Sequence, residues 1–90
     1  MFTISGTGGT GSIQFIGRDF SVVIAGNPAG STVRLEFSED LSTWYPHYQA
    51  GTVTEFTARD FKIMRNRTNY HWRLNCTVYG GTPFDADLEG

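Results

Sequence analysis

The fold class of this chain is decided by the stretch YHWRLNCTVY, residues 70–79. Its even-numbered residues are aromatic, aliphatic or Cys, and its odd-numbered residues are mostly polar. Successive side chains of a β-strand point to opposite faces of the sheet, so this alternation predicts one long strand with a single buried face. Thr32–Ser38 repeats the pattern, with Val33, Leu35 and Phe37 on one side. Two such strands indicate an antiparallel all-β domain.

Turn residues divide the rest of the chain into further short segments of strand composition. Residues 26–30, GNPAG, give the strongest turn signal, because Gly and Asn tolerate a positive φ and Pro fixes its own φ. Pro46 cannot donate a hydrogen bond to a neighbouring strand, so the strand around it is expected at a sheet edge or with a bulge. About seven strands with turns every ~8–12 residues are typical of a small antiparallel β-sandwich, immunoglobulin-like or jelly-roll-like, or of a small barrel. The expected strands are Ile13–Ile16, Phe20–Ala25, Thr32–Ser38, Trp44–Gln49, Thr52–Thr57, Phe61–Met64 and Tyr70–Tyr79.

A helix is the alternative for residues 58–64. Thr57 could cap it, with an acidic residue three positions further on. The alternation of apolar and polar residues over 61–63 favours a short strand instead. The sequence alone leaves both structures open.

The length of 90 residues allows one domain. We expect the β-sandwich to span residues 13–83. Residues 1–12 are expected to form a flexible N-terminal arm, because Ser5–Ser12 consists almost only of Gly, Thr and Ser. Residues 84–90 are expected to form an acidic, mobile C-terminal tail. The expected core comprises Val22, Ile24, Val33, Leu35, Phe37, Trp44, Phe56, Tyr70, Trp72, Leu74, Cys76 and Val78.

Composition and charge argue against several kinds of site. Cys76 is the only cysteine, so an internal disulfide is impossible, and Cys76, His47 and His71 lack the paired spacing of a structural zinc site. The net charge of −2, with both signs scattered along the chain, does not predict a nucleic-acid-binding surface. No apolar run approaches the ~20 residues that span a membrane, and no signal-peptide pattern is present. We therefore expect synthesis in a cytoplasm and use without processing.

No catalytic group is predicted. A nucleophile needs a base within reach. Cys76 shares the parity of Trp72 and Leu74 and is expected to be a small buried residue, whereas His71 lies on the opposite face of the same strand. The residues therefore predict a protein that is not an enzyme and has neither a cofactor nor a metal.

The best candidate for an interaction surface is the aromatic run Trp44–Tyr48, WYPHY. Its rings cannot all enter one small core, so we expect Trp44 to be buried and Tyr45 and His47 to point outward, where such rings suit protein interfaces. Arg73 and Tyr79 could extend the surface. The apolar residues of the N-terminal segment could order against a neighbouring subunit and so support a homo-oligomer, because a thin core gains from a partner. The expected interface residues are Phe2, Ile4, Ile13, Phe15, Tyr45, His47, Tyr48, Arg73 and Tyr79.

Two resemblances follow from these segments. SEDLSTW, residues 38–44, resembles the Asp-box hairpins of sialidase-like proteins, although Ser42 stands where that motif has Gly. This resemblance implies that Asp40 closes the turn and that Trp44 enters the core. The order TVRLEFS (32–38), TW (43–44), GTV (51–53), Phe56 and YHWRL (70–74) is similar to that of small β-sandwich virion proteins of tailed phages, and this similarity extends over residues 31–79.

The second resemblance implies a structural protein of the virion. Such proteins decorate or cement capsids, or form knobs on heads and tails. It implies binding to the major capsid protein or other virion subunits, at the capsid surface, after synthesis in the host cytoplasm. A tail or connector component differs mainly in location. A carbohydrate-binding or adhesion module would share most of these motifs, with Tyr45, His47, Tyr48 and Tyr79 as a platform for sugar stacking.

Overall fold

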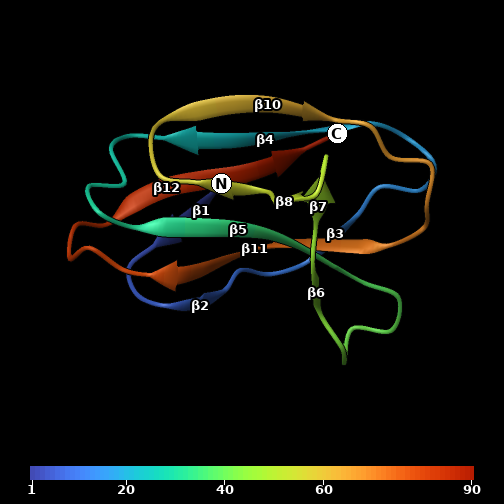
Figure 1. Ribbon diagram of the computed structural model, residues 1–90, viewed down its shortest axis with the longest axis horizontal. Coiled ribbons are helices and arrows are strands. Elements are labelled where there is room, and N and C mark those ends of the chain that lie inside the picture. The colour runs from blue at the N-terminus through green and yellow to red at the C-terminus, as the bar shows by residue number, and fades with distance from the viewer.

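Two antiparallel β-sheets lie face to face in the computed structural model, which describes residues 1–90 (Figure 1). Sheet A has the strand order β1 (Phe2–Ile4), β12 (Phe84–Glu89), β4 (Phe20–Ala25) and β10 (Asp60–Met64). Sheet B has the order β2 (Gly8–Gly9), β11 (His71–Val78), β5 (Thr32–Ser38) and β6 (Tyr45–Pro46). In addition, β3 (Ile13–Gln14) pairs with β11, and β9 (Glu55–Phe56) pairs with β5. A separate hairpin joins β7 (Tyr48–Gln49) to β8 (Thr52–Val53). The prediction of a small all-β sandwich is confirmed.

The centre of sheet B is the pair of strands that the alternation predicts. Leu74 lies opposite Leu35 and Cys76 opposite Val33, and all four side chains are buried. The intervening polar residues lie on the outer face. The register shifts between Cys76 and Val78, so the alternation ends there.

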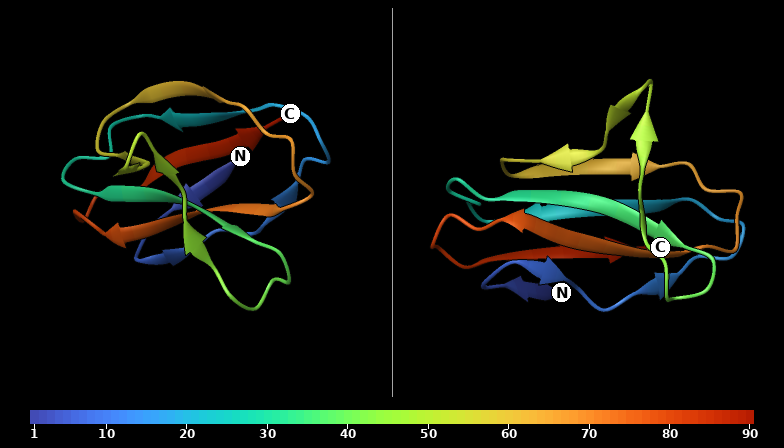
Figure 2. Two further views of the ribbon diagram at one scale, coloured as in Figure 1. Left: turned by 45° about the vertical axis from the view of Figure 1, so that its right-hand side comes forward. Right: turned by 60° about the horizontal axis from the view of Figure 1, so that its bottom comes forward.

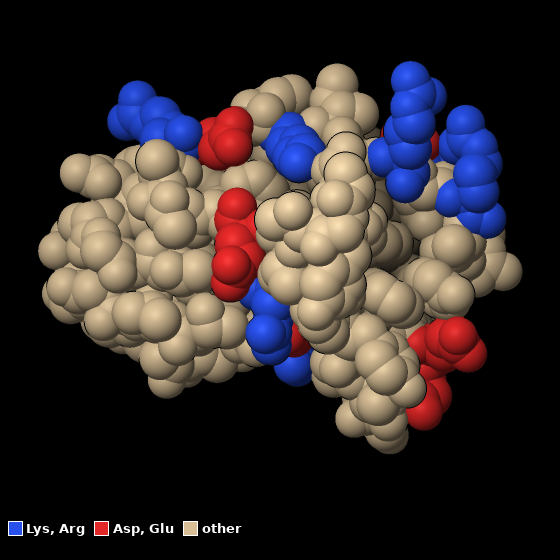
Figure 3. Space-filling view, viewed as in Figure 1, with Lys and Arg blue, Asp and Glu red and all other residues tan.

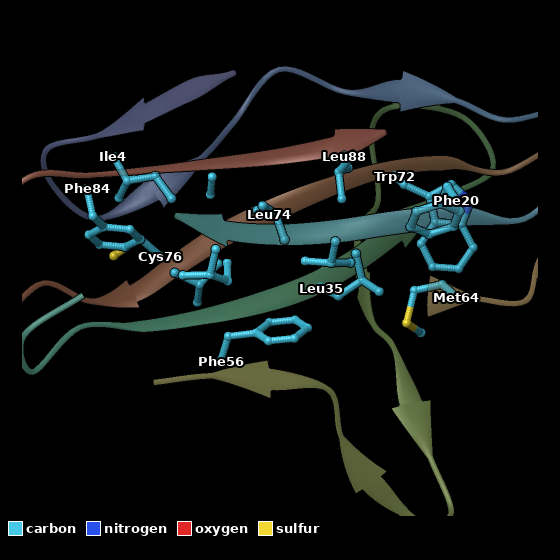
Figure 4. Close-up of a cluster of buried hydrophobic side chains, with 14 of the residues drawn as sticks. Ile4, Phe20, Leu35, Phe56, Met64, Trp72, Leu74, Cys76, Phe84 and Leu88 are labelled. Atoms are coloured by element: carbon cyan, nitrogen blue, oxygen red, sulfur yellow. The ribbon is translucent and has the colours of Figure 1, made fainter. Parts of the chain in front are cut away.

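The core fills the space between the sheets (Figure 4). Most of the expected core residues are buried, and Phe37 and Tyr70 are half-buried and packed against the core. Two expectations are wrong: Val78 is exposed because it lies beyond the register shift, and Trp44 is half-buried and stacks on Arg73, a residue of the outer face. The buried hydrophobic residues of the core that were not predicted are Ile4, Phe15, Phe20, Met64, Phe84, Ala86 and Leu88.

The prediction of a free N-terminal arm over residues 1–12 is wrong. β1 pairs with β12 in sheet A, and β2 pairs with β11 in sheet B. The Thr10 N–H donates to the Leu74 carbonyl over 2.8 Å, and the Leu74 N–H donates to the Thr10 hydroxyl over 3.1 Å. A Cβ on Gly9 would lie 2.8 Å from Nη1 of Arg73, so a larger residue there would displace the guanidinium. Part of the Gly-rich segment is thus an edge strand of sheet B.

The prediction of a mobile tail over residues 84–90 is also wrong. β12 lies between β1 and β4, so it is an inner strand of sheet A. Its sequence FDADLE alternates as a half-buried strand should, with three apolar side chains in the core and three carboxylates on the outer face. The sandwich therefore uses almost the whole chain and not only residues 13–83.

The middle of the chain keeps the expected turns but divides into shorter strands. The helix alternative for residues 58–64 is wrong, because Asp60–Met64 forms β10. The expected strand Trp44–Gln49 separates into β6 and β7, and β6 lies at an edge of sheet B, as Pro46 predicts. Ala50 and Gly51, both with positive φ, turn the chain between β7 and β8.

Candidate functional site

The β7–β8 hairpin projects from one side of the sandwich (Figure 2). Its tyrosine Tyr48 is 59% exposed, and Tyr45 in the neighbouring β6 is 51% exposed. Two backbone hydrogen bonds hold the base of the hairpin: the His47 N–H donates to Leu35 over 2.9 Å, and the Thr54 N–H donates to His47 over 2.8 Å. We call the exposed rings of Tyr45 and Tyr48 the tyrosine pair.

His47 anchors the hairpin and does not project from it, in contrast to the prediction. Its Nδ1 lies 2.7 Å from the Thr54 hydroxyl, and its ring centroid lies 5.7 Å from that of Trp72. Burial, together with the positive charge of Lys62, lowers the pKa of His47. A neutral imidazole therefore packs at the base of the hairpin at neutral pH.

The loop before β6 has the geometry that the Asp-box resemblance implies. The Asp40 carboxylate accepts hydrogen bonds from the backbone N–H groups of Ser42 (2.9 Å) and Thr43 (3.0 Å). These bonds lower the pKa of Asp40. The Ser38 hydroxyl accepts from the Leu41 N–H over 2.9 Å and holds Leu41 at its positive φ. Asp40 thus closes the turn as expected, although the tryptophan that follows stays on the outer face.

A buried carboxylate organises the outer face of sheet B. Glu36 is only 2% exposed and accepts hydrogen bonds from Arg34 Nε (2.8 Å), Arg73 Nε (2.8 Å) and Asn75 Nδ2 (3.1 Å). Burial alone would raise the pKa of Glu36, but the three donors outweigh it and hold the pKa below its ordinary value. The Arg73 guanidinium also lies 4.3 Å from the centre of the Trp44 ring. This cluster is internally satisfied, so Arg73 is engaged within the chain.

The structure does not assemble the predicted interface residues into one surface. Ile4 and Phe15 are buried in the core, so the prediction that they contact another subunit is wrong. Phe2 and Ile13 are half-buried, because their strands belong to the sheets. Tyr79 follows the C-terminal end of β11 and packs against the core. That end of β11 lies far from the tyrosine pair.

Sequence reasoning missed a second exposed apolar surface. Phe61 is 61% exposed and Ile63 is 65% exposed on the outer face of β10. Phe61 borders a depression of about 510 Å³ over β4 and β10, and Ile63 borders one of about 370 Å³ shared with Tyr48. The alternation in β10 signals a strand but not which of its faces is buried.

In the space-filling view, basic and acidic atoms meet near the middle of one face, and most of the surface around them is uncharged (Figure 3).

Comparison with protein-family models, with curated proteins and with solved structures finds no match to this chain. The structure holds no group of three or more His, Cys, Asp or Glu residues able to bind a metal ion. It also has no helix of the length and apolarity needed to cross a bilayer.

Proposed function

We propose that this chain is a non-enzymatic structural protein that binds a protein partner through the tyrosine pair. The observation that carries the proposal is the exposure of both rings, Tyr45 in β6 and Tyr48 on the β7–β8 hairpin, whose base is fixed by backbone hydrogen bonds. Tyrosine brings a large contact area at low cost in side-chain entropy, and a rigid hairpin lowers the ordering cost further. We therefore propose a protein interface that is centred on the rings of Tyr45 and Tyr48.

The setting that we propose is the surface of a phage capsid, where the chain decorates the shell by binding the major capsid protein. The support is the similarity of residues 31–79 to small β-sandwich virion proteins. The state of Cys76 supports the non-enzymatic part of the proposal. Its thiol is buried, burial raises its pKa, and its Sγ donates to the Val78 carbonyl over 3.2 Å. A thiol in this state is a poor nucleophile.

A glycan partner would have to stack on the tyrosine pair alone. The four-residue sugar platform expected from the sequence is not assembled, because His47 is packed on Trp72 and Tyr79 is distant. Along β5, the residues paired with Tyr45 and with Val78 lie five positions apart, which corresponds to roughly 17 Å. The protein partner is therefore the stronger proposal.

Co-sedimentation with undecorated capsids tests this function, with a glycan array run in parallel. We expect the wild-type chain to bind the capsids and Tyr48→Ser to reduce binding at least tenfold. Val78→Ser is the matched control, because it removes an exposed apolar side chain at the far end of sheet B. Sugar binding that Tyr48→Ser abolishes, without any capsid uptake, would refute the proposal.

A further inference from the structure

Strand β10 leaves an open edge on sheet A. Its one neighbour is β4, so its other side has no strand partner within the chain. Native proteins normally protect such an edge, because unpaired backbone groups accept a strand from another molecule. The inward-facing charge of Lys62 is one such protection, but the edge strand also carries the exposed Phe61 and Ile63 on its outer face. An open edge next to two large exposed apolar side chains is a suitable site for pairing with a strand of another molecule.

The charges of β10 are unpaired within the chain. Lys62 is half-buried on the inner-facing parity, and none of the chain's ion pairs includes it. Asp60, on the same parity, accepts a hydrogen bond only from the neighbouring N–H of Phe61, over 2.8 Å. A half-buried lysine without a counter-ion is unfavourable. The strand thus holds one cation and one anion two residues apart, and each lacks an ion-pair partner.

We propose that a second copy of this chain pairs with β10, antiparallel, about a two-fold axis at Phe61. In this register Asp60 of each copy lies directly opposite Lys62 of the other, with Cβ atoms about 4.5–5.5 Å apart. The two Phe61 rings meet on the outer face, and Ile63 lies opposite Arg59. Both unpaired charges gain a partner, and sheet A continues from one copy into the other.

The neighbouring registers lack this complementarity. Only shifts that keep each side chain on its own face are allowed, so the axis moves by one residue at a time. An axis at Lys62 places the two lysines opposite each other, which is repulsive. An axis at Ile63 sets Lys62 opposite Met64 and Phe61 opposite Arg65, with no ion pair. The charge pattern therefore selects one register and disfavours unspecific pairing at the same edge.

The position of the β7–β8 hairpin favours the same register. Tyr48 and Ala50 of the hairpin share a depression with Ile63 and Met64, and Ala50 shares another with Lys62, so the hairpin flanks β10 from Lys62 to its C-terminal end. An axis at Phe61 centres the overlap on residues 59–63, which meets the hairpin less than an axis at Lys62 or Ile63 would.

Sedimentation velocity over a concentration series up to about 1 mM tests the interface. We expect the wild type to dimerise, and Asp60→Lys and Lys62→Glu each to raise the dimer Kd by about tenfold or more. An equimolar mixture of the two variants should restore the dimer, because each then supplies the charge that the other lost. The double variant D60K/K62D should also dimerise, since it keeps the net charge and the complementarity.

Three results would overturn the inference. If the wild type stays monomeric throughout the series, β10 does not pair with a second copy, and its open edge would instead bind a strand of a different protein. A dimer that Asp60→Lys does not weaken has another register or another interface. If the two single variants are folded but their mixture stays monomeric, Asp60 and Lys62 do not pair between copies. Circular dichroism checks that each variant is folded. The tyrosine pair is unchanged in all these variants, so capsid binding and dimerisation can fail independently.

Discussion

Replacing Trp72 tests how the aromatic core holds the two sheets together. The indole ring centroid lies 4.9 Å from that of Phe20 in sheet A and 5.7 Å from that of Phe37 in sheet B. Because the residue is buried, Trp72→Ala should lower the free energy of unfolding by roughly 3–5 kcal/mol. A 90-residue domain has roughly 5–13 kcal/mol in total, so this variant should be only marginally folded.

The comparison variant Trp72→Phe separates packing from polarity. The Nε1–H of Trp72 is buried without a hydrogen-bond acceptor, and removing such a donor relieves about 1–3 kcal/mol. The smaller ring loses contacts worth about 1–2 kcal/mol. These effects nearly cancel, so Trp72→Phe should lie within about 1 kcal/mol of the wild type. Urea unfolding followed by circular dichroism measures both; equal losses in the two variants would refute the assignment of the ring to an apolar core.

Three further predictions concern other parts of the sandwich. Leu88→Ala should lower the free energy of unfolding by about 2–5 kcal/mol in urea titrations, whereas a side chain in a mobile tail would give almost no change. Gly9→Ala should displace the Arg73 guanidinium and cost about 1–3 kcal/mol in thermal unfolding, while Gly6→Ala, which has open space around its Cβ, should not. The pKa of Glu36 is lowered in the folded state, so the stability it provides is present above pH 4.5, its ordinary pKa, and is lost as the pH falls through the folded value. Unfolding measured from pH 7 down to about pH 3 should therefore show a smaller acid loss in Glu36→Gln than in the wild type.

The long strands could be predicted from sequence because each has one apolar face that is buried over most of its length. In β11 and β5 the alternation extends over seven or more residues, and any shift by one position would expose Leu74 and Leu35 together. Asp40 could be placed for a similar reason, since its carboxylate acts on amides two and three residues away. Local patterns of this kind need no knowledge of distant segments.

The chain ends could not be predicted in the same way. Gly8 and Gly9 carry no apolar pattern, and their pairing depends on a strand more than sixty residues away in sequence. β12 does alternate, but its three carboxylates resemble those of a solvated tail unless the neighbouring strands β1 and β4 are known. Backbone pairing between distant segments therefore accounts for both errors.

The candidate surfaces were only half predictable. The excess of rings in residues 44–48 required some to be exposed, and Tyr45 and Tyr48 are. In β10 the apolar Phe61 and Ile63 face outward, while Lys62 and Met64 face inward. That orientation follows from the register with β4, which pairs Met64 with Phe20 and Lys62 with Val22, and no rule of hydrophobic burial gives it.

Glu36 and Lys62 represent opposite solutions to one electrostatic problem. Glu36 is surrounded by three donors of its own sheet, whereas Lys62 has no carboxylate partner in the chain, although both carry charge in a partly dry environment. If a second copy completes β10, unfolding is coupled to dissociation, so the unfolding temperature must rise with protein concentration. We expect calorimetry over a hundredfold range of concentration to show this rise in the wild type and in D60K/K62D, and to show a smaller rise in Asp60→Lys alone. A concentration-independent unfolding temperature in the wild type would mean that Lys62 remains unpaired and that the apolar edge of β10 serves another protein.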